Sequence, residues 1–214
     1  MNELILRPKS PFNGFINFFT KRTNVFDFFS AEEEKNNNGW ADASSVINYS
    51  ITCTNAFCQW VSKNNTQKTF IIFSFECPIF LTHYTLKTRT DHNENTQVSW
   101  TVECLVEDDT WITVDTKENR EELKSGHGAY YTYKCDRSFI YTKKIRIWCK
   151  KTSNANNHLY FHLSRIEFFG KMDVGECKPP FNINQRYTCK YKNSFFHSFI
   201  SLPVILLVSW YIES

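Results

Sequence analysis

Eight cysteines, six histidines and 22 acidic side chains give this 214-residue chain many groups that could do chemistry. Their spacing, however, forms no nucleophile elbow, no catalytic carboxylate pair and no glycine loop that opens a helix. Gly126-His127-Gly128 is typical of a turn between strands. His158 and His162 would lie about 13 Å apart along a strand, too far to share a metal. Glu32-Glu33-Glu34 is most simply a solvated segment, with a calcium-binding cluster as the alternative. The sequence therefore predicts no enzyme, no metal site and no cofactor.

The cysteines are expected to be reduced. They occupy positions 53, 58, 77, 104, 135, 149, 177 and 189. The chain is longer than domains that need disulfide staples, and no export signal is seen at its start. Cys104 and Cys149 lie inside strand patterns, where a free thiol behaves as a small hydrophobic group. Cys177 and Cys189 are the exception, because they flank a Pro-Pro turn and could pair if the protein were exported.

Three polar segments carry residues suited to binding. The candidate ligand residues are Trp40 and Asp42; His92, Asn93 and Asn95; and Asn154, Asn156, Asn157 and His158. An aromatic ring can stack on the apolar face of a sugar while amides and imidazoles satisfy its hydroxyl groups. A protein or peptide ligand fits the same segments equally well. For any single residue, a soluble asparagine-rich turn is the simpler explanation.

The net charge of +3 is small, and the basic residues are scattered. Their densest cluster runs from Lys143 to Lys151 and surrounds Trp148, a combination that could bind a phosphate backbone or an RNA base. We interpret it instead as a solvated strand face, which makes nucleic acid an unlikely partner. Arg146 is expected to be internal and paired with Glu103 or Glu167, because an unpaired buried guanidinium is costly. An outward Arg146 is the alternative.

The elements that must position these residues are short strands. Between Leu81 and Gly170, large apolar or β-branched residues alternate with polar ones in the two-residue period of a strand with one buried face. We predict strands near residues 70–76, 81–90, 98–106, 111–115, 129–134, 143–150 and 160–169. Their polar connections and the 17% aromatic content indicate an all-β, antiparallel jelly-roll sandwich. We expect its core to contain Trp100, Leu105, Trp111, Ile145, Ile147, Ile166 and Phe168.

The two ends of the chain fall outside this pattern. We assign residues 1–11 to a lead-in, 12–172 to the sandwich domain, 173–194 to a linker and 195–212 to an apolar extension. Residues 195–212 contain no Asp, Glu, Lys or Arg, and as a helix they would reach about 27 Å, near the lower limit for crossing a bilayer. A membrane anchor is slightly preferred over a cleaved lipid-anchor signal or a non-membrane extension. The expected location is cytoplasmic, or membrane-associated through this tail.

Several segments resemble the discoidin domain, also called the coagulation factor 5/8 type C domain. Those similar to its successive strands are Leu81–Arg89, Val98–Glu103, Asp109–Trp111, Lys144–Ile147 (the family's "R-Y-I-R-I" strand) and Leu163–Gly170 (its closing "L-S-x-I-E-F-x-G"). The likeness covers roughly Phe12 to Met172 and implies a galactose-binding-like jelly roll that meets ligands through loops at one end. Pro11–Ile16 is similar to the segment that leads into this domain in protist proteins carrying a BTB region.

Three departures separate this chain from the family pattern. Asn48 stands where the family has Asp, Lys68 replaces a Trp, and Phe73-Ser74-Phe75 replaces a strand ending in Asp-Leu or Asp-Phe. These changes affect a transferred ligand or calcium site more than they affect the fold. The sequence therefore predicts a non-catalytic module that recognises a carbohydrate or a protein or peptide partner through rim loops. A membrane-tethered structural or scaffolding protein is the alternative.

Overall fold

The computed structural model describes residues 3–22, 28–33, 43–49, 60–61, 69–89, 96–124, 127–152 and 161–177. The strands within these residues are β1 (Glu3–Leu6), β2 (Phe29–Glu33), β3 (Trp60–Val61), β4 (Thr69–Lys87), β5 (Gln97–Leu105), β6 (Trp111–Lys117), β7 (Tyr130–Lys134), β8 (Tyr141–Thr152), β9 (His162–Leu163) and β10 (Arg165–Asp173). The helical elements are short: α1 (Phe15–Thr20) and the 3-10 turns η2 (Ala43–Ile47), η4 (Glu107–Asp109) and η5 (Val174–Glu176).

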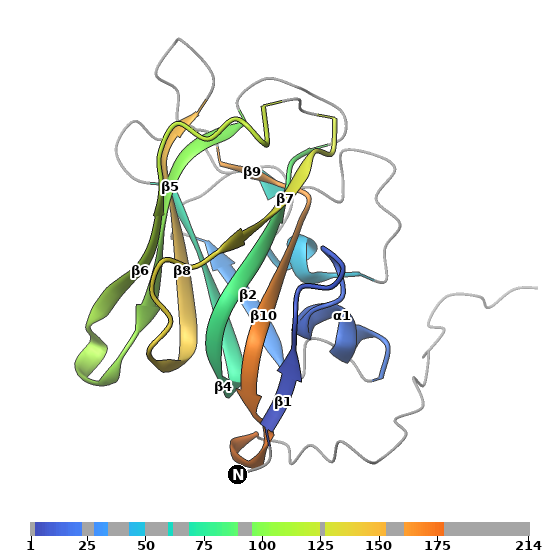
Figure 1. Cartoon of the computed structure of the whole chain (residues 1–214), viewed down its shortest axis with the longest axis vertical. Helices are drawn as coiled ribbons and strands as arrows, with labels where there is room; N and C mark the ends of the chain where they lie inside the picture. Colours follow the sequence, from blue (N-terminus) through green and yellow to red (C-terminus); the bar gives the residue numbers. More distant parts are fainter. Residues whose placement is uncertain are drawn as a thin grey trace, which may run out of the picture.

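Strand β4 takes part in both layers of the fold (Figure 1). Its first half, residues 69–75, pairs with β2 and β8, and its second half, residues 79–87, pairs mainly with β10 and β7. A shift in register between Ser74 and Ile79 marks the passage from one set of neighbours to the other. The first layer therefore has the order β2-β4-β8-β5-β6, and the second layer has the order β1-β10-β4-β7. All these pairings are antiparallel.

Aromatic side chains fill the space between the layers. Phe73 and Phe75, from the first half of β4, pack edge-on against Phe168 of β10, with ring centroids 5.2 and 5.4 Å apart. Trp100 of β5 packs in the same manner against Tyr133 of β7, at 4.9 Å. All five side chains are buried, and each such pair contributes about 0.5–1.5 kcal/mol beyond the area it buries. The predicted all-β antiparallel sandwich is confirmed.

The predicted strands are present, with two differences in their boundaries. The segments predicted at 70–76 and 81–90 are joined in the single bent strand β4, and the one predicted at 160–169 is divided between β9 and β10. Sequence reasoning missed β1, β2 and β3, which are short. Glu32 lies in β2 with an exposed side chain, so it is solvated as expected, but on a strand.

The core prediction is confirmed for Trp100, Ile145, Ile147, Ile166 and Phe168, which are fully buried. It is wrong for Leu105 and Trp111, which are half-buried. Leu105 ends its strand and lines a hollow at the edge of the sandwich, while the Trp111 ring lies beside the guanidinium of Arg146 on the outer face of the first layer. An alternating pattern identifies two faces of a strand but not where the strand leaves the core.

A buried carboxylate, that of Glu167 on β10, holds the N-terminal segment against the second layer. Its Oε1 accepts a hydrogen bond from the N–H of Ile16 at 2.8 Å, and its Oε2 accepts one from the N–H of Asn17 at 3.0 Å. These are backbone donors of the first turn of α1, which the helix itself leaves unpaired. A Cβ at Gly14 would lie 2.3 Å from the carbonyl oxygen of Phe168. Only glycine allows the segment to approach this closely.

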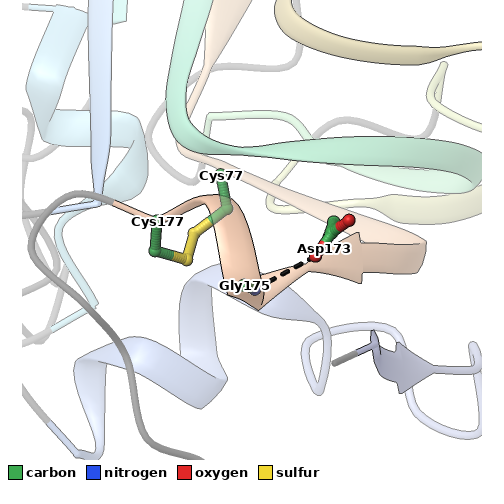
Figure 2. The surroundings of a disulfide bond; sticks show 4 residues. All are labelled: Cys77, Asp173, Gly175 and Cys177. Carbon is green, nitrogen blue, oxygen red and sulfur yellow. Dashed lines mark hydrogen bonds between the residues drawn. A yellow bond between two sulfur atoms is a disulfide. The ribbon is translucent and has the colours of Figure 1, made fainter. Parts of the chain in front are cut away.

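Both ends of the described chain are tied to the sandwich. Strand β1 pairs with β10, Glu3 opposite Asp173, so the residues expected as a lead-in contribute a strand. A disulfide joins Cys77 to Cys177, close to the turn in which Asp173 accepts the N–H of Gly175 at 3.0 Å (Figure 2). The expectation of reduced thiols is wrong for this pair, because the bend in β4 brings Cys77 to a residue 100 positions away.

The other cysteines that the structure describes are not in disulfides. Cys104, Cys135 and Cys149 are free, as predicted, and they are buried. Cys189 lies outside the described residues. The apolar extension at 195–212 also lies outside them. Among the residues that the structure describes, no helix is long and apolar enough to cross a membrane.

We expect the stability conferred by Glu167 to decrease as the pH rises. Burial raises the pKa of Glu167 to about 7, against the lowering effect of the backbone N–H groups. Because the folded-state pKa lies above the ordinary 4.5, the stabilisation is complete below about pH 4.5 and is lost as the pH rises through about 7. Urea unfolding at a series of pH values should show a decrease on the order of 3 kcal/mol across this window.

The matched variant for this measurement is Glu167→Gln, which removes the titrating group. Its free energy of unfolding should vary less between pH 5 and 8 than that of the natural chain. Histidines titrate in both proteins, so the difference between the two curves isolates Glu167. Identical curves would contradict the assignment.

Loss of the disulfide should weaken the domain. Closing a loop of 100 residues restricts the unfolded chain and is worth about 4–5 kcal/mol in the entropy account. Cys177→Ser should lower the free energy of unfolding by about this amount, and a reductant should lower that of the natural chain but not of the variant. Peptide mapping under non-reducing conditions should recover Cys77 cross-linked to Cys177. Free thiols at both positions in the folded, unreduced protein would refute the pairing.

Candidate functional site

The nine predicted ligand residues lie outside the described part of the chain. They are Trp40, Asp42, His92, Asn93, Asn95, Asn154, Asn156, Asn157 and His158. They belong to three stretches, here named the first, middle and late segments: residues 34–42, 90–95 and 153–160. The structure does not test which of them meet a ligand, but it does describe the strand ends from which the three segments leave.

These strand ends lie at one end of the first layer. Thr152, the last residue of β8 before the late segment, is paired with Gln97, the first residue of β5 after the middle segment. Glu33, the last residue of β2 before the first segment, is paired with Ile71 of β4, and Ile71 is paired with Ile147 of β8. Glu33, Gln97 and Thr152 therefore lie at one end of the sandwich, which we call the segment rim.

Buried polar side chains form the base of the segment rim. Thr96, Gln97 and Thr152 are all buried. The Nε2 of Gln97 donates to the carbonyl oxygen of His162 at 2.6 Å. The Oε1 of Gln97 has no hydrogen-bond partner in the structure as described. An unpaired buried acceptor costs about 1–3 kcal/mol, so a water molecule or a polar ligand group that reached this oxygen would be stabilised there.

A second polar cluster lies inside the sandwich, and its side chains form hydrogen bonds with one another. The hydroxyl of Tyr84 donates to Asp115 Oδ2 at 2.6 Å and accepts from Trp100 Nε1 at 2.8 Å. Lys117 Nζ donates to the other carboxylate oxygen of Asp115 at 2.5 Å. Burial raises the pKa of both Tyr84 and Asp115. Because these groups satisfy one another and join β4, β5 and β6, we assign them a structural role.

An aromatic cluster surrounds Arg146 on the outer face of the first layer. The Nε and Nη2 of Arg146 donate to Glu103 Oε2 at 2.8 and 2.6 Å, and Trp148 Nε1 donates to the same oxygen at 2.5 Å. The guanidinium lies 4.2 Å from the ring of Trp111 and 4.4 Å from that of Trp148. The predicted pairing with Glu103 is confirmed. The internal position is wrong, since both side chains of the pair remain 18% exposed on an outward face.

In the basic stretch from Lys143 to Lys151 all four lysines are exposed, and two of the basic side chains have partners within the chain. Arg146 is paired with Glu103, and Lys151 donates to the side-chain oxygen of Asn119 at 3.1 Å. Lys143 lies at the other end of β8, in a hollow that also contains carboxylates. Binding of a phosphate backbone needs several unpaired cations along one path, and the interpretation of this stretch as a solvated strand face stays a prediction.

The described residues offer neither a metal cluster nor a reactive thiol. No group of three or more His, Cys, Asp or Glu side chains among them is placed to hold a metal ion. Burial raises the pKa of Cys104 and of Cys149 to about 12 and raises that of Cys135 further. At neutral pH these thiols are protonated and poor nucleophiles.

Comparison with known proteins finds similarity only among solved structures. No family model and no curated protein matches the chain. A family 32 carbohydrate-binding module of NanJ from Clostridium perfringens, in complex with galactose, is 15% identical, covers 66% of this chain and 91% of its own, and has a TM-score of 0.45. Another module from Clostridium perfringens, in complex with GalNAc-β-1,3-galactose, is 11% identical, with coverages of 66% and 94% and a TM-score of 0.49.

An F5/8 type C domain from Bacteroides fragilis is 15% identical, with coverages of 67% and 91% and a TM-score of 0.47. It is a domain of the family that the sequence resembles. At these identities and scores, the fold assignment rests on the strand pairing and the core of this chain itself.

Glu103→Gln should destabilise the first layer by about 1–3 kcal/mol, because one charged oxygen accepts three hydrogen bonds there. Urea unfolding followed by tryptophan fluorescence measures the stability. Lys144→Gln, a change at an exposed position of the neighbouring strand β8, is the control and should leave the midpoint nearly unchanged. Equal midpoints for the natural chain and Glu103→Gln would contradict the role given to this carboxylate.

Proposed function

We propose that this chain is a non-catalytic binding module that recognises a carbohydrate at the segment rim. The observation that carries the proposal is the strand register. Gln97, just after the middle segment, lies directly opposite Thr152, just before the late segment. The first segment leaves β2 at the same end of the layer. The described strand ends next to these three segments lie at one end of the layer, which supports a single site there.

The side chains of the three segments suit the chemistry of a sugar. They include one tryptophan, two histidines, an aspartate and five asparagines among the predicted ligand residues. Amides and imidazoles both donate and accept hydrogen bonds, as vicinal hydroxyl groups require. The tryptophan ring offers a flat apolar surface to the C–H face of a pyranose.

A binding role without catalysis is supported by how the described titratable groups are used. The buried Asp115 cluster links strands, the Glu167 carboxylate holds α1, and the free thiols are protonated. None of these described groups forms a nucleophile and base pair facing an open site, which acyl or glycosyl transfer would need.

The disulfide is informative about the cellular compartment of the module. Disulfides persist in oxidising compartments and are rare in the cytosol. The Cys77–Cys177 bond therefore favours an exported domain over the cytoplasmic location expected from the sequence. Export would also place the module where extracellular glycans are found.

A glycan array first ranks the ligands of the full chain. Sugar binding is then tested by calorimetric titration with galactose, N-acetylgalactosamine and the best array ligand. We expect the best array ligand to bind, and Trp40→Ala to weaken it about tenfold or more, a loss of about 1.4 kcal/mol. Phe139→Ala removes an aromatic side chain that is 54% exposed at the opposite end and should leave the affinity unchanged. Absence of binding to every array sugar, or equal losses in the two variants, would refute the proposal.

A further inference from the structure

The end of the sandwich opposite the segment rim contains a hollow of about 780 Å³. It lies where β5 ends and β8 begins, whereas the segment rim lies where β5 begins and β8 ends. Its apolar lining comes from Pro78, Leu105, Val106, Ile140 and Tyr141. Tyr141 is 37% exposed, and the neighbouring Phe139 is 54% exposed. Exposed apolar side chains gathered beside a concave surface are typical of an interaction site.

The disulfide fixes two walls of this hollow. Pro78 follows Cys77 in the bend of β4, and Glu176 precedes Cys177 in η5; both residues line the hollow. The covalent bond therefore holds together two wall segments that are 100 residues apart. Figure 2 shows the bond running from β4 to the turn that carries Cys177.

Hydrogen bonds fix the remaining wall. The hydroxyl of Thr142 donates to the carbonyl oxygen of Leu105 at 2.7 Å, which joins the start of β8 to the end of β5. The hydroxyl of Tyr141 donates to Glu3 Oε1 at 2.5 Å, which joins β8 to β1. This bond raises the pKa of Tyr141 to about 12 and keeps its ring in one orientation. A hollow held in shape before binding loses little conformational entropy when a ligand enters.

The charged side chains around the hollow have both signs. Glu107, Asp173 and Glu176 contribute carboxylates, and Lys143 and Lys144 contribute ammonium groups. The three carboxylates oppose an anionic membrane or a nucleic acid. The lining is mainly apolar and the Tyr141 hydroxyl is already bonded to Glu3, which favours a ligand with an apolar side chain. An extended peptide with an apolar side chain next to a basic one meets both the apolar lining and the acidic wall.

We propose that this hollow binds an extended peptide segment of a partner protein, in which an apolar side chain enters the hollow and an adjacent Lys or Arg faces Asp173 and Glu176. The two lysines face the other side, where they meet peptide carbonyl groups or an acidic side chain. This site goes beyond the proposed sugar site and does not depend on it. The module would then hold a glycan at one end and a protein at the other.

The test starts from a phage-displayed library of random peptides selected on the oxidised full chain. We expect enrichment of peptides with an apolar residue beside Lys or Arg. A synthetic, fluorescently labelled copy of the best peptide should lose affinity about tenfold or more with Glu176→Lys, a change at an exposed position. Lys143→Glu should alter the affinity less, and a reductant should weaken binding because it releases Cys177 from Cys77.

The matched control is Trp40→Ala, which should bind the peptide as the natural chain does. Failure to enrich such peptides, or equal affinity of the best peptide for the natural chain and Glu176→Lys, would overturn the proposal. So would loss of peptide binding with Trp40→Ala, since it would place the peptide at the segment rim. Binding to phosphatidylserine vesicles that is lost with Lys143→Glu would identify a membrane surface instead and would also overturn it.

Discussion

The organisation of the molecule depends on one strand that belongs to two layers. β4 pairs with β2 and β8 along its first half and with β10 and β7 along its second. Its bend near Cys77 turns the chain from one layer to the other. Phe73, Phe75 and Tyr84 on this strand all point into the core that results. The positions of both ends of the sandwich follow from that arrangement.

The two ends are stabilised by different physical means. At the hollow end, the Cys77–Cys177 bond and the hydrogen bond from Thr142 to Leu105 hold wall segments in place. Along the side of the second layer, the Glu167 carboxylate satisfies the first donors of α1 and keeps the N-terminal segment against β10. At the segment rim, the described anchors are paired backbone strands with buried polar side chains beneath them. A binding module needs such a rigid base, since ligand-contacting segments gain precision from the elements that carry them.

The sequence was informative about the fold because the relevant signal is local. A two-residue apolar period identifies strands and the faces they bury, so Trp100, Ile145 and Ile147 could be placed in the core. The period does not show where a strand passes the edge of the core, which is why Leu105 and Trp111 were misplaced. Strands β1 and β2 were missed because what forms them is not local: they pair with β10 and β4, which lie far away in the sequence.

Non-local features were harder to predict. The Cys77–Cys177 bond depends on the bend in β4, which no spacing in the sequence reveals. Glu103 was one of two carboxylates expected to pair with Arg146, and the register of β5 and β8 places it opposite Arg146. The alternative, Glu167, is occupied by backbone N–H groups of α1. The candidate ligand residues were chosen by chemical type alone, and what the structure adds is the common rim from which their segments leave.

The central claim is that a sugar binds at the segment rim and leaves the opposite hollow free. Amide chemical-shift mapping of the isotopically labelled full chain, titrated with its best glycan-array ligand, tests this claim most directly. The account predicts saturable shifts at the anchoring residues Thr96, Gln97 and Thr152 and none at Leu105 to Glu107. Shifts centred on the hollow, or unchanged amides at all three rim anchors on saturation with the sugar, would contradict it.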